Sequence, residues 1–252
     1  MIRILVTNDD GIASAGLQSL AQALAPLGEV TVVAPAKEQS AVGHGITVRR
    51  ALELRPDRNG WYSVDGTPTD CVNVAVTEVL GRVPDLVVSG INEGLNLGDD
   101  VTYSGTVAGA LEGVLLGVPA LAVSLQRSPT PMDYTQAGRV AKQLAASILE
   151  RGLPHRTLLN VNVPSREARG CRVTVQAGRS QSFGMVGTPT GDERSAVRFD
   201  SIELAWEPHE RSDYEAVQAG WVSITPLQPD WTHHAAIEAV ERLTLSTPAE
   251  VE

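Results

Sequence analysis

Ile2-Arg3-Ile4-Leu5-Val6-Thr7-Asn8-Asp9-Asp10-Gly11 is a short apolar run that ends in two adjacent carboxylates. The run predicts the first strand of an α/β sheet, and such a strand usually ends at the crevice where ligands bind. Neighbouring carboxylates repel each other unless one takes up a proton, both are hydrated or a cation lies between them. Asn-Asp-Asp-Gly is also good turn chemistry, so a solvated turn is the alternative. Asp9 and Asp10 are therefore candidate ligands of a hard divalent cation, which prefers carboxylate oxygens.

Strands and helices are predicted to alternate over the rest of the N-terminal half and beyond. Continuous apolar runs predict buried strands at 30–34, 86–89, 120–124 and 158–163, and we expect the last of these to end the sheet. Helical spacing of apolar residues predicts helices from Ser14, from about Thr69, over 106–116 and around 137–148. Alternation over 46–54, a turn at 56–60 and a run at 61–64 predict an antiparallel hairpin. The pattern indicates a parallel, doubly wound α/β sheet with right-handed crossovers.

The segment after Pro164 breaks this alternation. Residues 172–175 and 221–225 are predicted strands, and a polar stretch rich in Gly, Thr and charge separates them. Six of the ten aromatic residues fall in this region: Phe183, Phe199, Trp206, Tyr214, Trp221 and Trp231. Because aromatic residues are enriched in interface cores, we expect this arm to contact another subunit or to cover the active site, rather than to fold on a core of its own. We expect a single domain over 1–252, with a core at 1–168, a β-hairpin arm and strand at 169–230, and a C-terminal helix and tail at 231–252.

Composition excludes several classes of protein. The 252 residues carry 20 basic and 30 acidic side chains, a formal net charge of −10, which argues against binding to a nucleic-acid polymer. The two cysteines lie far apart and indicate neither a disulfide framework nor a zinc site. The most apolar segment, 114–125, is interrupted by Gly117 and Pro119 and is shorter than the ~20 residues of a membrane span. The N-terminal apolar run is too short for a signal peptide, so we expect a cytoplasmic protein that does not insert into membranes.

Four polar segments are expected to meet at one edge of the sheet, because three of them follow strands and one opens a helix. They are Asp9-Asp10, the 35–45 loop with Ser40 and His44, the glycine-rich 89–100 loop with Asn92 and Asn96, and Ser104-Gly105-Thr106. Asp9, Asp10, Ser40 and Asn92 would form an all-oxygen ligand set, which suits Mg²⁺ or Mn²⁺ and disfavours zinc. Free N–H groups at the start of a helix attract phosphate. Taken singly each residue has an ordinary alternative, such as a turn cap for Ser40.

Several motifs together resemble the SurE family, stationary-phase survival proteins that act as metal-dependent nucleotidases. The motifs are Thr7-Asn8-Asp9-Asp10-Gly11, Gly66-Thr67-Pro68-Thr69-Asp70-Cys71, Ser89-Gly90-Ile91-Asn92, Asn96-Leu97-Gly98, Tyr103-Ser104-Gly105-Thr106-Val107-Ala108-Gly109-Ala110 and Gly220-Trp221-Val222-Ser223-Ile224-Thr225-Pro226-Leu227. They are collinear from the N-terminus to about Asp230. Leu95 departs from the family, since many relatives have proline there, and the stretch 178–213 matches little.

The resemblance implies a Rossmann-like core that hydrolyses nucleoside 5′- and 3′-monophosphates, with short polyphosphate as a further substrate of some members. It implies one divalent metal ion per subunit on Asp9, Asp10, Ser40 and Asn92. It places the substrate phosphate near Asn96, Ser104, Gly105 and Thr106. It also implies homodimers or homotetramers that exchange C-terminal elements.

The predicted chemistry needs few catalytic side chains, because phosphoryl transfer depends chiefly on positioning and electrostatics. We expect a water molecule to attack phosphorus with Asp9 accepting its proton and Asn96 donating to the phosphate. The rival route is direct attack by Asp9 to form an aspartyl-phosphate. His44 either protonates the leaving ribose oxygen or orders the Ser40 loop.

Three other classes of function are alternatives to this one. A dinucleotide-binding oxidoreductase would need Gly-x-Gly-x-x-Gly in the first strand-to-helix turn, where this chain has acids. A haloacid-dehalogenase-type phosphatase would need Asp-x-Asp, which is missing from that turn. A non-catalytic sensor of metal or nucleotide, built on the same site, is the alternative that sequence leaves open.

Overall fold

The computed structural model describes residues 1–128, 131–178, 184–189, 195–200, 206–207 and 209–243. Its strands are β1 (Arg3–Thr7), β2 (Glu29–Pro35), β3 (Leu54–Pro56), β4 (Tyr62–Val64), β5 (Leu86–Glu93), β6 (Ala120–Leu125), β7 (Leu158–Val163), β8 (Cys171–Val173), β9 (Gly184–Pro189), β10 (Ser195–Asp200) and β11 (Val222–Leu227). Its α-helices are α1 (Ala15–Leu24), α2 (Pro68–Val74), α3 (Gly105–Leu115), α4 (Thr135–Arg151), α5 (Asp213–Gln218) and α6 (Ile237–Glu241).

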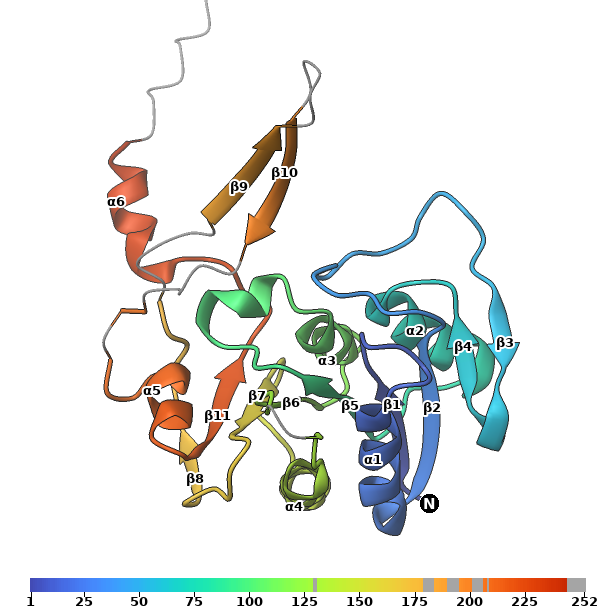
Figure 1. Cartoon of the computed structure of the whole chain (residues 1–252). Coiled ribbons are helices and arrows are strands. Elements are labelled where there is room, and N and C mark those ends of the chain that lie inside the picture. Colours follow the sequence, from blue (N-terminus) through green and yellow to red (C-terminus); the bar gives the residue numbers. More distant parts are fainter. Residues whose placement is uncertain (129–130, 179–183, 190–194, 201–205, 208, 244–252) are drawn as a thin grey trace, which may run out of the picture.

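Nine of the described strands form one sheet in the order β3-β4-β2-β1-β5-β6-β7-β11-β8 (Figure 1). β1 pairs in parallel with β2 on one side and with β5 on the other. β5, β6 and β7 continue the parallel part of the sheet. The chain therefore builds outward from β1 in both directions, which confirms the doubly wound prediction. The reversal places a topological switch point at the carboxyl ends of β1 and β5, where such sheets bind ligands.

Helices cover both faces of the sheet (Figure 1). Ile4 and Val6 of β1 pack with α1 and α4 in one core, and Leu5 packs with α2 and α3 in the other. Successive side chains of a strand point to opposite faces, so a strand with a core on each side needs a continuous apolar run. This explains why the central strands lack the polar alternation of β3 and β4.

Side-chain caps fix where the helices begin. The Ser14 hydroxyl accepts from the Leu17 N–H at the start of α1. Thr67 and Asp70 form a capping box at α2, in which each side chain accepts from the other's backbone N–H. Such caps satisfy N–H groups that have no partner within the helix. Among the described residues, no helix is long and apolar enough to cross a lipid bilayer.

Two expectations about the strands are wrong. β7 does not end the sheet, because β11 pairs antiparallel with it and β8 lies beyond β11. β7 is buried on both faces, and the later strand satisfies the backbone groups along its outer edge. The predicted strand over 46–54 is also absent except for Leu54, and Ile46 and Val48 are exposed by 56% and 77%. The antiparallel hairpin itself is confirmed, but it is limited to β3 and β4.

The segment after Pro164 divides between the main sheet and a separate hairpin. β8, α5 and β11 belong to the body of the molecule, whereas β9 and β10 pair only with each other among the described strands (Figure 1). Trp206 stacks on Tyr214 with ring centroids 5.0 Å apart, and Trp221 lies beneath the guanidinium groups of Arg169 and Arg172. These three aromatic side chains therefore have partners within the chain. Phe183 and the Phe199 side chain lie outside the described residues, and the subunit contact stays a prediction.

Gly16 allows α1 to approach the end of β5. A Cβ at this position would lie 2.0 Å from the Ile91 carbonyl oxygen and 3.2 Å from the Tyr134 ring. Because overpacking a core costs about 1–3 kcal/mol, we expect Gly16→Ala to lower the free energy of unfolding by about 2 kcal/mol in urea titrations. Gln22→Ala, at an exposed position of the same helix, is the matched control and should change it little. Equal stability of the Gly16→Ala and wild-type proteins would contradict this close packing.

Candidate functional site

A cavity of about 270 Å³ opens at the switch point, where β1 and β5 end and α3 begins. The structure brings six of the sequence-predicted site residues into its wall: Asp9, Asp10, Ser40, Asn92, Asn96 and Ser104. They come from three strand-end loops and one helix start, as expected for a parallel sheet. Gly105, Thr106 and His44 do not line this cavity.

Asp9 is held rigidly at the floor of the cavity. Its side chain is 6% exposed, and its Oδ1 accepts from the Thr106 hydroxyl at 2.6 Å. Its backbone oxygen accepts from the Gln39 N–H, which ties the end of β1 to the Ser40 loop. Burial raises the pKa of the Asp9 carboxyl above its ordinary value, and the hydrogen bonds from Thr106 counteract only part of this effect. The carboxylate is thus fixed in place, but its hydrogen bonds do not fully offset the cost of burying its charge.

Asp10 is the less satisfied of the two acids. Its Oδ2 is buried and has no hydrogen-bond partner among the described residues. Burial, and next the charge of Asp9, raise the pKa of Asp10 to about 6. A buried carboxylate oxygen without a partner is costly, and a nearby positive charge would remove that cost.

Ser40 and Asn92 complete an oxygen-rich wall around the two acids. The Ser40 hydroxyl donates to Glu38 Oε1 at 2.6 Å, so its oxygen lone pairs are available to accept. The Asn92 amide nitrogen donates to the Gly94 carbonyl oxygen at 2.9 Å, which leaves the Asn92 side-chain oxygen as its acceptor atom. In the part of the chain that the structure describes, no three His, Cys, Asp or Glu side chains cluster as a metal centre. Two carboxylates with neutral oxygens fit Mg²⁺ or Mn²⁺, which need few protein carboxylates.

Asn96 is locked by a buried polar network that sequence reasoning missed. Its backbone N–H donates to Asn162 Oδ1, and its side-chain amide donates to the Ser124 hydroxyl at 2.7 Å. Its carbonyl oxygen accepts from the side chains of Asn160 and Asn162. An amide group has two hydrogens, so Asn96 retains one for a ligand. These partners sit on β6 and β7, where asparagines in otherwise apolar strands were the available signal.

The N-terminus of α3 forms another part of the site. Ser104 caps the helix and lines the cavity, and its hydroxyl accepts from the Val107 N–H at 3.1 Å. Thr106 is fully buried and its hydroxyl donates to Asp9. Gly105 lies against the same carboxylate, because a Cβ there would be 2.7 Å from the Asp9 Cβ. The structure therefore sets Thr106 and Gly105 behind Asp9, and their contact with phosphate stays a prediction.

His44 lies beside the neighbouring cavity, next to α3. Its Nε2 is 2.8 Å from Glu112 Oε2, and Asn73 donates to the other oxygen of Glu112. Burial raises the pKa of Glu112, but hydrogen bonds from His44 and Asn73 outweigh it and hold the pKa below the ordinary value. This contact ties the loop that carries Ser40 to α3, and both roles expected for His44 stay predictions.

Two further residues enter the site without having been predicted. Arg127 follows β6, lines the cavity and donates through Nε to the Glu93 carbonyl oxygen at 2.9 Å. Among the described lining residues, it is the one with a cationic side chain. The Glu93 carboxylate accepts from the Tyr134 hydroxyl. Glu93 is the last residue of β5 and Arg127 follows β6 by two residues, at the edge that carries the other site residues, so strand position alone could have indicated them.

The fold and the cavity define a doubly wound α/β protein with an acidic, oxygen-lined site at its topological switch point. The chain belongs to the SurE family: the family described as survival protein SurE matches residues 4–183. This confirms the resemblance inferred from the motifs.

Similar proteins cover nearly the whole chain. A protein of Pelobacter propionicus named 5′-nucleotidase SurE is 47% identical over 242 residues, covering 95% of this chain and 98% of its own. A protein of Geobacter sulfurreducens with the same name is 44% identical, covering 97% of this chain and 95% of its own. The crystal structure of the SurE protein from Aquifex aeolicus superposes with a TM-score of 0.86 at 39% identity, covering 96% of this chain and 99% of that one.

Proposed function

We propose that this chain is a metal-dependent nucleotidase that releases phosphate from nucleoside 5′-monophosphates, with 3′-monophosphates and short polyphosphate as further substrates. The observation that carries the proposal is the buried, unpartnered Asp10 oxygen beside Asp9 in an oxygen-lined cavity. The names of the similar proteins, 5′-nucleotidase SurE, support the substrate class. An acidic wall repels a phosphate ester, so the site needs a cation to bind its substrate.

Asp9, Asp10, Ser40 and Asn92 would hold one Mg²⁺ or Mn²⁺ ion per subunit. When bound, the ion supplies a Lewis acid and neutralises the charge of the phosphate. Asn92 is oriented for this role because its nitrogen is engaged by Gly94, and Ser40 because its proton is engaged by Glu38. Such partners of ligand residues fix their orientation and are worth about 10–100-fold in affinity or activity.

Asp9 is the residue that would accept the proton of an attacking water molecule. Thr106 fixes the direction of its carboxylate, and burial raises the pKa of Asp9 above its ordinary value, which favours uptake of a proton. Direct attack by Asp9 on phosphorus is the rival route, and it would leave a labelled phosphoenzyme that can be trapped with denaturant.

Helix α3 and Asn96 would bind the non-bridging phosphate oxygens. The N-terminus of α3 carries partial positive charge and ends at Ser104 in the cavity wall. Asn96 adds a donor that the network on β6 and β7 holds in place. Donors fixed before the substrate arrives do not have to reorganise during the reaction.

Phosphate release from a panel of nucleoside 5′- and 3′-monophosphates and short polyphosphate, with Mg²⁺, Mn²⁺ or chelator, tests the proposal. We expect release from the 5′-monophosphates that requires a divalent ion. Binding of metal and nucleotide without release of phosphate would instead identify a sensor. Release that persists after exhaustive chelation would contradict the metal site.

Arg127→Ala is expected to raise KM for a nucleoside monophosphate about 10-fold, because a charge-assisted hydrogen bond to an anion is worth more than a neutral one. The change in kcat should be smaller, and added salt should reduce the difference, since Arg127 is exposed. Steady-state kinetics at two ionic strengths measure both effects. Arg139→Ala removes a cation that pairs with Glu167 outside the cavity, and it should leave KM unchanged. An unaltered KM in Arg127→Ala would exclude a role in substrate binding.

A further inference from the structure

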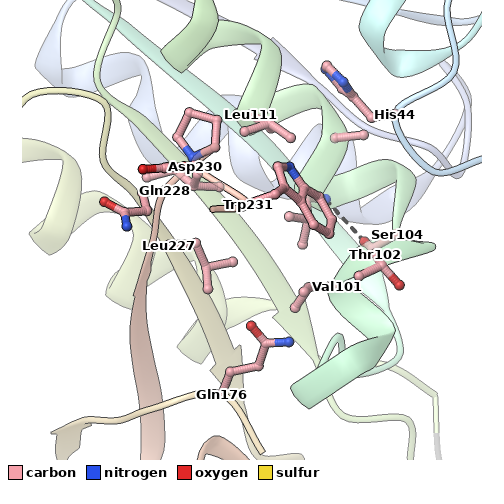
Figure 2. A pocket seen from close by; sticks show the side chains of 14 residues that line it. His44, Val101, Thr102, Ser104, Leu111, Gln176, Leu227, Gln228, Asp230 and Trp231 are labelled. Atoms are coloured by element: carbon pink, nitrogen blue, oxygen red, sulfur yellow. Dashed lines mark hydrogen bonds between the residues drawn. The ribbon is translucent and has the colours of Figure 1, made fainter. Parts of the chain in front are cut away.

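A second cavity, of about 200 Å³ and shown in Figure 2, shares the lining residue Ser104 with the acidic one. It lies between α3, the 3-10 helix Gly98–Thr102 and the chain that leaves β11. Leu111 and Leu227 form part of its apolar wall, and Trp231 lies across it in the close view (Figure 2). The role of this cavity does not follow from the metal and phosphate chemistry of its neighbour.

Ser104 lines both cavities. It is the residue that caps α3, so the proposed phosphate site lies at the boundary between the two spaces. A phosphate ester held at the N-terminus of α3 would therefore have the acidic cavity on one side and the apolar cavity on the other. The second cavity is where the rest of such a substrate would extend.

Trp231 offers a flat apolar surface to a ligand. The residue is 78% exposed although indole is among the largest apolar groups in proteins. Gln176 and Gln228 stand at the cavity wall with amide groups that both donate and accept (Figure 2). A cavity that combines an aromatic face with polar amides can bind a nucleobase, by stacking and by hydrogen bonds to the base edge.

The charged side chains that line this cavity are already paired. Asp230 lines it and pairs with His234 at 2.8 Å, and His44 is paired with the Glu112 carboxylate. The hydrogen bond from His234 holds the pKa of Asp230 well below its usual range. Among its described lining residues the cavity therefore offers no unpaired cation to a phosphate, and its largely apolar wall suits an uncharged base, so each cavity suits a different end of the same molecule.

We propose that the cavity bounded by Leu111, Leu227 and Trp231 is a nucleobase subsite, with Trp231 as the stacking partner. The proposal rests on the proposed nucleotidase function and adds the means by which the enzyme distinguishes nucleotides from other phosphate esters. Gln176 lines the same cavity on the far side from Trp231 (Figure 2), and it is the proposed hydrogen-bond partner: its Nε2 is 3.5 Å from Asp99 Oδ1, and its amide oxygen would accept from the base edge.

The test compares hydrolysis of adenosine 5′-monophosphate with that of ribose 5-phosphate, which lacks the base, by wild type, Trp231→Ala and Trp231→Phe. Base stacking on an aromatic side chain is worth enough to expect a loss of about 10-fold or more in kcat/KM for the nucleotide in Trp231→Ala. The rate with ribose 5-phosphate should not change, and Trp231→Phe should retain most of the nucleotide preference. Val173→Ala, another exposed apolar residue, is the control and should match wild type.

Two outcomes of this comparison would overturn the subsite. Equal kcat/KM of wild type for both esters would remove it and leave the nucleotidase proposal as a general phosphatase. An equal loss on both esters in Trp231→Ala, with a smaller assembly in size-exclusion chromatography, would show that a second copy of the chain covers the ring instead.

Binding of adenosine alone keeps the subsite testable if no phosphate is released from either ester. We expect adenosine to quench tryptophan fluorescence of the wild-type protein in chelator, because the subsite contains no cation ligand. The quenching should be lost in Trp231→Ala and kept in Val173→Ala. Absence of quenching in the wild-type protein would overturn the subsite, whatever the outcome of the phosphate assay.

Discussion

Asp9→Asn is expected to lower kcat for a nucleoside 5′-monophosphate more than about 100-fold. Loss of an outer partner of a metal ligand already costs about 10–100-fold, and Asp9 is proposed as both ligand and proton acceptor. The fold should survive, because Asn has nearly the same shape and its side-chain oxygen still accepts from Thr106. Initial rates of phosphate release with saturating Mn²⁺, together with a thermal unfolding curve, separate the chemical effect from a folding defect.

The matched control for this loss is Asp57→Asn, the same change of charge in the turn between β3 and β4. It should retain the wild-type rate. If Asp9→Asn retained more than about a tenth of the wild-type rate, the activation barrier would have risen by less than ~1.4 kcal/mol. So small a rise would exclude Asp9 as a catalytic ligand. Both the proton-acceptor role and the direct-attack route would then fail.

The parallel core was predictable because the sequence signals for its strands and helices are local. Strands such as β1 and β6 are continuous apolar runs, and Ser14 and Ser104 are N-cap residues that mark the start of the helices that follow. The pairing of β11 with β7 was not predictable in this way, since the two strands lie far apart in the chain and no local pattern links them. Residues 46–53 were wrongly predicted as a strand, because apolar and polar residues can alternate in an exposed loop that does not face a core.

The residues of the candidate site also differ in how far local sequence predicts them. Asp9, Asp10 and Asn92 were predictable from their place after strands, and the structure gathers them in one cavity. The hydrogen bond from the Thr106 hydroxyl to Asp9 was not predicted, and the contact of Thr106 with phosphate stays a prediction. Arg127 was missed because a single arginine after β6 belongs to no recognisable motif. Its position after a predicted strand was the signal that could have indicated it. Direction of a side chain depends on tertiary contacts that spacing does not specify.

Asp10 predicts how metal and pH act together on stability. Its pKa in the folded protein is about 6 against an ordinary 3.8, so the folded state binds this proton more tightly than the unfolded chain does. Stability from this group is complete below the ordinary value of 3.8 and is lost as pH rises through about 6. In chelator at neutral pH, Asp10→Asn should therefore have a higher Tm than wild type, and the difference should shrink toward pH ~4.

Saturating Mn²⁺ should reverse that order. A ligand that binds only the folded state at a hundred times its Kd stabilises it by roughly 2.7 kcal/mol, and the wild-type protein gains this while Asp10→Asn, which lacks the anionic ligand, gains little. The two thermal unfolding curves should thus cross between chelator and Mn²⁺ at neutral pH, with Asp57→Asn following wild type in both. An equal gain from Mn²⁺ in wild type and Asp10→Asn would show that the cation binds elsewhere. If the Tm difference between Asp10→Asn and wild type in chelator did not vary with pH, the ionised Asp10 carboxylate would not destabilise the folded state.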